Sequence, residues 1–220
     1  MPTLLLRVRA PMMSWGDHSR FTIRDTRTEP TKSAIIGLIC AALGRPRWES
    51  VNDLAALTMG VRVDKEGIVQ CDYHTIKKAI TSDGQIKKPP KDTVPSYRYY
   101  IADADFVVGL EGKSRSFLEQ LDRALQQPKW QLYFGRKSFI PSRPVRIGIQ
   151  DVPLLRTLQQ YPYEGKRKVD RRLRYVLEVP NSLDVRQDVP IDWLHRQFGS
   201  RCVKTEFYPM EVYAECTSPS

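Results

Sequence analysis

The sequence predicts an α+β fold of the ferredoxin-like class, in which two helices cover one face of an antiparallel sheet. The first 150 residues order as strand, helix, strand, a long polar insertion, and then strand, helix and strand again. This order is the split βαβ pattern. The chain has 220 residues, of which 41% are hydrophobic, so it is long enough to bury a substantial core. We therefore expect a ferredoxin-like domain over residues 1–150 and a small β-rich extension over residues 151–220.

The first strand and helix are indicated by hydrophobic runs and by the residues that end them. Thr3 to Ala10 form an apolar strand that a proline ends, and a loop with several arginines follows. The stretch PTKSAIIGLICAALG, at 30–44, then predicts a helix from about Lys32 to Leu43. Thr31 is placed to be its N-cap, and Gly44 is placed to be a left-handed C-cap.

A short helix and a hairpin are expected next. Residues 50–57 suit a helix with Ser50 as its cap. Val61–Asp64 and Ile68–Tyr73 flank a Lys-Glu-Gly turn and alternate in polarity, which predicts a β-hairpin. The following stretch, Ile76–Ser96, is rich in lysine, proline and turn residues. It is too polar for the core and too long for a simple connection, so we expect an insertion there.

The second half of the domain repeats the pattern of strand, helix and strand. Tyr97–Leu110 has the composition of a strand, and Ser114–Gln127 has apolar residues at helical spacing, with Ser114 as the cap. Further strands are expected at 131–134, 145–149, 173–179 and 201–208. The last two strands either extend the sheet or form a small appended lobe.

The net charge of +10 is unevenly distributed along the chain. Residues 136–175 contain eleven Lys or Arg against three Asp or Glu, whereas the residues from Val176 onward contain four against seven. A basic face of this density suggests a polyanionic partner, with nucleic acid as the first candidate. The alternative is a solvated basic loop without a partner.

The composition also bears on the compartment. No hydrophobic run approaches the roughly 18 residues that a membrane span needs, and the N-terminal segment is too short for a signal peptide. The four cysteines lie far apart without C-x-x-C pairing, as expected of buried thiols in a reducing compartment. We expect a cytoplasmic protein that does not associate with membranes.

Two segments could bind phosphate. The helix starting at Lys32 offers free N–H groups, an ammonium and the Ser33 hydroxyl, which suit one or two phosphates of a polymer. It is no P-loop, because Thr26 and Thr31 stand where glycines would be required. The tetrapeptide Gly135-Arg136-Lys137-Ser138 combines close backbone approach, two cations and a hydroxyl. Alone, the helix start is better explained by ordinary capping.

Aromatic residues flank the insertion. Tyr73 and His74 precede it, and three tyrosines at 97, 99 and 100 follow it. Aromatic rings beside lysines can stack on unpaired bases, and each stacked base contributes about 1–3 kcal/mol to binding. The alternative is that these tyrosines only pack on the two faces of a strand. Among three histidines no metal-binding spacing or complete catalytic set is evident. His74 with Tyr73 and a nearby lysine could still cleave RNA without metal, and this alternative stays open.

With these motifs in view, the chain resembles the CasD family of type I-E CRISPR Cascade subunits, within the RAMP superfamily. The resemblance lies in R-x-x-x-P-M-x-x-W-G from Arg7, P-T-K-S-x-I-x-G-L from Pro30, D-Y-H-T, D-A-D-F and Y-F-G-R-K-S-x-x-P. The last 50 residues match more weakly. The motifs are specific as a set, although no single one is.

The resemblance implies a noncatalytic subunit that holds the 5′ handle of the CRISPR RNA, with an RRM-like fold. The insertion at about 77–96 would be the family's thumb, packing over the guide and a neighbouring backbone subunit. The protein partners would be the neighbouring backbone subunit and the large subunit, and target DNA would lie nearby. Relatives in type I-C systems cleave repeat RNA with Tyr, Lys and His, but this chain has Tyr73 and His74 without a Lys-His pair.

These arguments define a set of candidate RNA-binding residues. We expect Lys32, Arg136, Lys137 and Arg27 to contact phosphates, and Tyr73, His74 and Trp15 to contact bases. Hydrogen bonds to the RNA backbone would come from the hydroxyls of Ser14, Ser33 and Ser138. The set is completed by Arg20, Thr31, Arg98 and Gly135. No catalytic residue, metal or cofactor is expected. A third hypothesis is a protein scaffold, in which the basic stretch Gly165–Arg174 binds an acidic partner.

Overall fold

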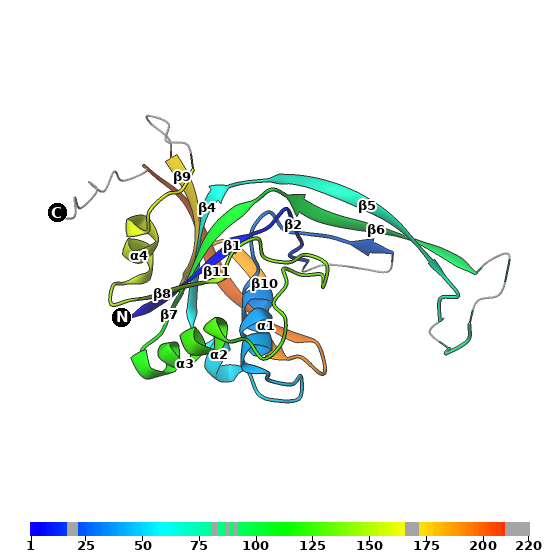
Figure 1. Cartoon of the computed structure of the whole chain (residues 1–220), viewed down its shortest axis with the longest axis horizontal. Coiled ribbons are helices and arrows are strands. Elements are labelled where there is room, and N and C mark those ends of the chain that lie inside the picture. Colours follow the sequence, from blue (N-terminus) through cyan, green and yellow to red (C-terminus); the bar gives the residue numbers. More distant parts are fainter. Residues whose placement is uncertain (17–21, 81–82, 87–88, 90–91, 166–171, 210–220) are drawn as a thin grey trace.

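The computed structural model describes the chain except residues 17–21, 81–82, 87–88, 90–91, 166–171 and 210–220. Its body is a curled antiparallel sheet of seven strands with helices on both faces (Figure 1). The strand order is β10-β11-β9-β4-β7-β1-β8. The strands are β1 (Thr3–Arg9), β4 (Thr58–Lys65), β7 (Asp105–Glu111), β8 (Arg146–Gln150), β9 (Arg172–Val179), β10 (Asp184–Asp192) and β11 (Gln197–Pro209). The predicted mixture of helices with an antiparallel sheet is confirmed.

Helices cover the two faces of the sheet unequally. The larger core packs under α1 (Lys32–Leu43), α2 (Asn52–Ala55) and α3 (Arg115–Gln126), whereas α4 (Leu154–Gln160) covers a smaller core on the other face. Strand β7 shows why: Phe106 and Val108 face the larger core, and Val107 between them faces the smaller one. A strand buried on both faces reads as a continuous apolar run, as β7 does.

Helices α1 and α3 lie where their sequence signals predict them. Thr31 caps α1 and Gly44 ends it in the left-handed conformation, with φ +70°. Ser114 caps α3 by accepting a hydrogen bond from the N–H of Phe117. The short helix α2 begins later than expected, with Val51 at its N-cap position, while Ser50 Oγ accepts from the N–H of Asn52 at 3.4 Å.

The hairpin predicted between 61–64 and 68–73 is wrong. Strand β5 (Ile68–Lys77) does not pair with β4; it pairs along its whole length with β6 (Thr93–Ala102) in a second sheet. Strand β4 is almost wholly buried, whereas β5 is almost wholly exposed, so β5 has no apolar face to add to the core. Gly67, at φ +75°, turns the chain from one sheet into the other.

The second sheet is built around β6. Strands β2 (Met12–Met13) and β3 (Ile23–Arg24) flank it near the body, and β5 and β6 together run outward as a long two-stranded arm (Figure 1). We call residues 68–102 the β5–β6 arm. Of the insertion expected at about 77–96, residues 81–82, 87–88 and 90–91 lie outside the described residues, and the described part lies at the far end of the arm, where the N–H of Lys78 donates to the carbonyl of Asp92 at 3.0 Å.

Two other predictions need correction, and two elements were missed. The single strand expected over 97–110 is divided into β6 and β7 by a turn at Asp103, whose φ is +56°. Residues 131–134 are not a strand, because Phe134 turns inward to pack on Trp15. Helix α4 and strand β10 were not predicted. The C-terminal strands β9, β10 and β11 continue the main sheet from β4.

The helices are short. The longest described helices have 12 residues, and within the described part of the chain none is long and apolar enough to cross a membrane.

Candidate nucleic-acid interface

The start of α1 contacts an anion, but the anion belongs to the protein itself. Asp188, on β10, accepts a hydrogen bond from the N–H of Lys32 at 2.8 Å. Thr31 Oγ1 accepts from the N–H of Ala34 at 3.3 Å, and lies 3.3 Å from the Ser33 hydroxyl. These contacts satisfy part of the positive helix terminus internally.

The side chain of Lys32 also lies in the protein interior. It is 2% exposed, and its ammonium lies 2.9 and 3.0 Å from the two carboxylate oxygens of Glu178. Burial lowers the pKa of Lys32, and the Glu178 carboxylate partly opposes that shift. Beside this pair, Arg201 donates to Asp188 at 2.6 and 2.8 Å. The phosphate contact predicted for Lys32 is therefore replaced by a buried ion pair that joins α1 to the sheet.

Acid should weaken this buried network. Arg201 lowers the pKa of Asp188 against the opposing effect of burial. In a second buried cluster, Glu29 lies 2.8 Å from Arg174 and 2.6 Å from Arg186, which lower its pKa in the same way. Since a carboxyl group has a pKa of about 4 when unfolded, the stabilisation is complete above that pH. This stabilisation is lost as the pH falls through the lowered pKa values of these carboxyl groups in the folded state. We expect urea unfolding between about pH 5 and pH 2 to show a smaller pH dependence in Asp188→Asn than in wild type. An unchanged slope would contradict this. Burial raises the pKa of Asp105, so this residue gives the opposite pH dependence of stability, and it does so in wild type and in Asp188→Asn alike.

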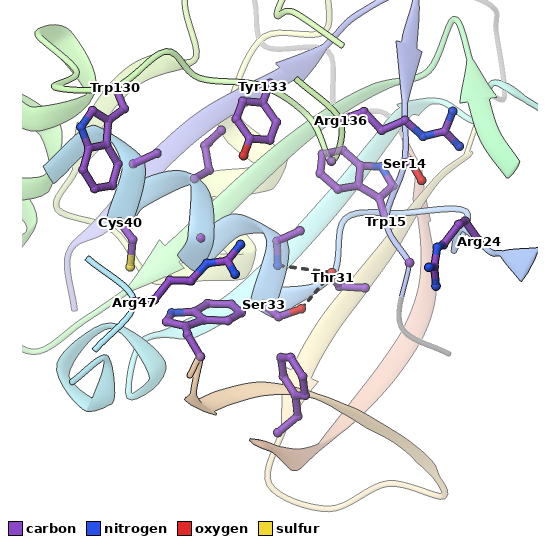
Figure 2. Close-up of a pocket in the computed structure, with 18 of the residues that line it drawn as sticks. Ser14, Trp15, Arg24, Thr31, Ser33, Cys40, Arg47, Trp130, Tyr133 and Arg136 are labelled. Carbon is purple, nitrogen blue, oxygen red and sulfur yellow. Dashed lines mark hydrogen bonds between the residues drawn. The ribbon is translucent and has the colours of Figure 1, made fainter. Parts of the chain in front are cut away.

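A cavity of about 630 Å³ opens beside α1 (Figure 2). Its lining brings together three predicted segments, around Ser14, Ser33 and Gly135, that are far apart in the sequence. Among the described residues that line it none is acidic, and five are arginines. The charged and aromatic members of the lining are Arg24, Arg45, Arg47, Arg98, Arg136, Trp15, Trp130, Tyr133, Trp193 and Phe198.

Two neighbouring guanidiniums make one end of the cavity strongly positive. Arg136 is held by donating to the carbonyl of Tyr99 at 3.0 Å and by lying over the ring of Phe139 at 5.0 Å. Burial and then the charge of Arg98 lower the pKa of Arg136. The carboxylate of Asp72, 3.6 Å from Arg136, offsets the repulsion only in part. An anion bound between these side chains would relieve that repulsion.

Trp15 is placed differently from the expectation that it stacks on a base. It is 2% exposed and packs against Phe134, with ring centroids 5.7 Å apart. Its indole N–H is buried and has no acceptor within the described structure. Trp15 is therefore part of the cavity wall rather than an exposed platform.

Gly135 joins the predicted basic loop to the first loop of the chain. Its φ is +92°, and the N–H of Ser14 donates to the carbonyl of Phe134 at 3.1 Å. A Cβ added at Gly135 would collide with the carbonyl oxygen of Ser14. The hydroxyl of Ser14 is already used, because it donates to the carbonyl of Tyr99 at 3.2 Å.

Replacing Gly135 should therefore disturb the cavity. Gly135→Ala combines an unfavourable positive φ, which costs about 1–3 kcal/mol, with the collision against Ser14. Gly84→Ala is a matched control, because Gly84 has φ +80° but open space around its missing Cβ. Urea unfolding should show a larger loss of stability for Gly135→Ala. Equal losses in the two variants would contradict the close packing at Gly135.

The predicted base-contacting residues of the arm lie outside the cavity lining. Tyr73 and Tyr97 face each other across the strands, with ring centroids 5.4 Å apart in an edge-to-face arrangement. His74 Nε2 lies 2.5 Å from the carboxylate of Asp72, which in turn approaches Arg136. The arm is thereby connected to the cavity through Asp72.

The remaining candidates are placed as follows. Lys137 and Ser138 are exposed on the loop after Gly135. The N–H of Arg27 donates to the carbonyl of Trp15 at 3.0 Å, which holds the first loop closed. Arg20 lies outside the described residues, as does most of the basic stretch 165–174. Within the described part of the chain, no group of three or more His, Cys, Asp or Glu could hold a metal ion.

Sequence reasoning missed much of the cavity. Arg45 and Arg47 follow α1, Trp130 follows α3, and Trp193 lies between β10 and β11. These residues belong to segments with no local motif, and only the packing of α1 against α3 and β10 brings them together. Arg24 had a weak signal, because it lies in the arginine-rich first loop.

Comparison with known proteins identifies the class to which this fold and cavity belong. Residues 3–204 match the family described as CRISPR-associated protein (Cas_Cas5). The chain belongs to this family of CRISPR-associated proteins, and the resemblance seen in the motifs is confirmed.

One curated relative and two solved structures make the likeness more specific. The chain is 28% identical over 221 residues to the CRISPR system Cascade subunit CasD of Escherichia coli (strain K12), covering 90% of this chain and 92% of that protein. A chain in a structure described as a CRISPR RNA-guided surveillance complex matches with TM-score 0.85 and 30% identity, covering 94% and 90%. A crystal structure of a Cas protein matches with TM-score 0.77 and 41% identity, covering 94% and 95%.

Proposed function

We propose that this chain is a noncatalytic, RNA-binding subunit of a Cascade-type surveillance complex. In this role it holds the 5′ handle of the CRISPR RNA and contacts the neighbouring backbone and large subunits. The observation that carries the proposal is the cavity beside α1, which has five arginines in its lining and no acidic residue among the described ones. The similarity to a Cascade subunit and to a chain of an RNA-guided surveillance complex supports the same assignment.

The chemistry of the cavity suits a single-stranded RNA segment. Arginine forks bind phosphate oxygens in pairs of charge-assisted hydrogen bonds. Aromatic side chains accept bases that are splayed out of a strand. In an RNA-guided complex the guide itself reads the target sequence by base pairing, so a handle-holding subunit needs phosphate contacts and base pockets rather than groove recognition. The cavity and the basic loop at Gly135 provide both kinds of contact.

The thumb role proposed for the arm rests on its form. Strands β5 and β6 run outward together and carry exposed tyrosines, among them Tyr73 and Tyr97 (Figure 1). A two-stranded ribbon of this kind is marginally stable alone, so a partner that covers it would stabilise it. We propose a neighbouring subunit and the guide RNA as that partner.

The test is binding without turnover. The full chain is incubated in EDTA with end-labelled single-stranded RNA carrying the host's CRISPR repeat sequence, and the products are run on native and denaturing gels. We expect a shifted, intact RNA whose affinity falls as salt is raised. Intact RNA without any shift, even at low salt, would contradict the proposal.

One observation favours a second candidate function, a metal-independent endoribonuclease. The contact between His74 and Asp72 is that of a general base oriented by a carboxylate, and both lie on an exposed strand. Under this alternative, the denaturing gel shows discrete products that disappear in His74→Ala. Asp72→Asn should then lower the cleavage rate as well, whereas His195→Ala should not, because His195 is an exposed histidine paired with Asp192 outside the arm and the cavity lining.

A further inference from the structure

Arg136 belongs to the cavity lining, yet its charged end lies beside an acidic residue of the β5–β6 arm. Figure 2 shows the side chain of Arg136 pointing away from Tyr133 and Trp130, which also line the cavity. Asp72, on β5, is not part of the lining, and its carboxylate lies 3.6 Å from Nη1 of Arg136. The same guanidinium is therefore within reach of the arm and of an anion in the cavity.

The contact between Arg136 and Asp72 is weak. At 3.6 Å it is an ion pair without a hydrogen bond, and the side chain of Asp72 is 44% exposed. The carboxylate oxygen that faces Arg136 also lies 2.5 Å from Nε2 of His74, so it is shared. Exposed ion pairs of this kind contribute little, whereas a guanidinium binds phosphate through short, paired hydrogen bonds. A phosphate would therefore displace Asp72 from Arg136.

Arg136 does not depend on Asp72 for its position. Nη2 of Arg136 donates to the carbonyl of Tyr99 at 3.0 Å, and the guanidinium lies 5.0 Å from the centre of the Phe139 ring. These two contacts orient the side chain without the carboxylate. Asp72 therefore occupies a binding position on Arg136 rather than building it.

The charges around Asp72 favour an exchange of partners. Arg98 lies directly opposite Asp72 across the two strands, and within the described part of the chain it forms no ion pair. Burial, and next the charge of Arg98, lower the pKa of Arg136. Two guanidiniums thus share one carboxylate, which leaves positive charge for a phosphate to balance. A bound phosphate would in turn repel the carboxylate.

We infer that Asp72 is an internal competitor of the RNA backbone: it pairs with Arg136 in the free chain, and an RNA phosphate bound in the cavity takes its place. The displaced carboxylate stays paired with His74, which it already contacts. This inference rests on the proposed function and deepens it, because it gives the arm control over the affinity of the cavity. When RNA binds, the arm loses one tie to the loop at Gly135 and keeps the other, at the Tyr99 carbonyl.

The test measures whether removing the competitor strengthens RNA binding. The affinity of the full chain for a fluorescein-labelled single-stranded RNA of the repeat sequence is measured by anisotropy at fixed salt. We expect Asp72→Asn to bind roughly 3- to 10-fold more tightly than wild type, because it removes both the competing ion pair and the repulsion of phosphate. If the role of Asp72 were to orient Arg136, the variant would instead bind more weakly, and this result would overturn the inference.

Asp103→Asn is the matched control, because it removes the same charge from an exposed residue at the base of the arm. Asp103 has φ +56°, a conformation that asparagine also adopts readily, and it lies outside the cavity lining. Within the described residues it pairs with neither Arg98 nor Arg136. This control should therefore change the affinity by less than about twofold.

A double-mutant cycle with Arg136→Gln shows whether the gain acts through Arg136. In the Arg136→Gln background, the gain from Asp72→Asn should fall to about twofold or less, because the competing pair is already absent. If Asp72→Asn binds RNA no more tightly than Asp103→Asn, or if its gain is as large without Arg136, the inference is overturned while RNA binding stands. If neither wild type nor the variants bind RNA, the proposed function and this inference are both overturned.

Discussion

Asp188→Ala is expected to lower the free energy of unfolding by about 3–5 kcal/mol, because it breaks a buried ion pair and leaves Arg201 only the longer contact with Glu178, at 3.6 Å. Asp188 accepts two hydrogen bonds from the guanidinium of Arg201 and one from the backbone at Lys32. Both Asp188 and Arg201 are almost completely buried. Alanine therefore removes the nearest charge that compensates Arg201 and also the acceptor for the N–H of Lys32 at the start of α1.

The measurement is equilibrium unfolding in urea at neutral pH, with Asp184→Ala as the control. Asp184 lies on the same strand but is exposed, and its contact with Arg186 is long, at 3.4 Å. The double variant Asp188→Leu with Arg201→Met should recover much of the lost stability, because two apolar side chains can replace a buried ion pair. A loss in Asp188→Ala no larger than in Asp184→Ala would refute the role assigned to this network.

Removing the paired guanidiniums is expected to give the largest loss of RNA affinity. Arg98→Gln should weaken binding of the repeat-derived RNA by roughly 10- to 100-fold, since a charge-assisted contact to phosphate contributes about 1.5–3 kcal/mol. Arg98 is the cleaner position, because within the described part of the chain its side chain makes one hydrogen bond, to Ser96 Oγ at 3.3 Å. Arg136→Gln should weaken binding similarly but also costs the contact with Tyr99.

Salt dependence distinguishes a phosphate contact from a general loss of charge. If Arg98 neutralises one phosphate of a single strand, the slope of log K against log salt should become shallower by about 0.7 in the variant. Arg156→Gln is the matched control, since Arg156 is exposed on α4, on the opposite face of the sheet. An equal loss in Arg156→Gln would mean that only net charge matters, and would contradict a defined phosphate site.

The sequence predicted well those features that depend on neighbouring residues. Helices α1 and α3 have their caps at Thr31 and Ser114, and β1 begins with three consecutive leucines, so residues that are neighbours in the sequence indicate all three elements. The family could also be recognised, because its motifs are short stretches with unusual composition. The basic loop at Gly135 was found for the same reason, and its position at the cavity follows from the φ that only glycine adopts easily.

Predictions failed where the partner of a segment is distant in the chain. Strand β5 alternates like one half of a hairpin with β4, yet it pairs with β6, because pairing depends on which strand offers a matching exposed edge. Lys32 has the sequence context of a phosphate-binding residue, yet Glu178, 146 residues away, neutralises it. No pattern near Lys32 could indicate that partner.

The sequence by itself therefore determined helices α1 and α3, strand β1, the basic character and the family of this protein, since each follows from composition or from residues a few positions apart. Only the tertiary structure decided which cations meet solvent and which are consumed by internal carboxylates. It turned Lys32 inward and left Arg98 and Arg136 facing a cavity without an acidic residue among its described members. The physical reason is that burial and charge pairing are set by contacts between distant segments, and an ion's availability to RNA depends on both.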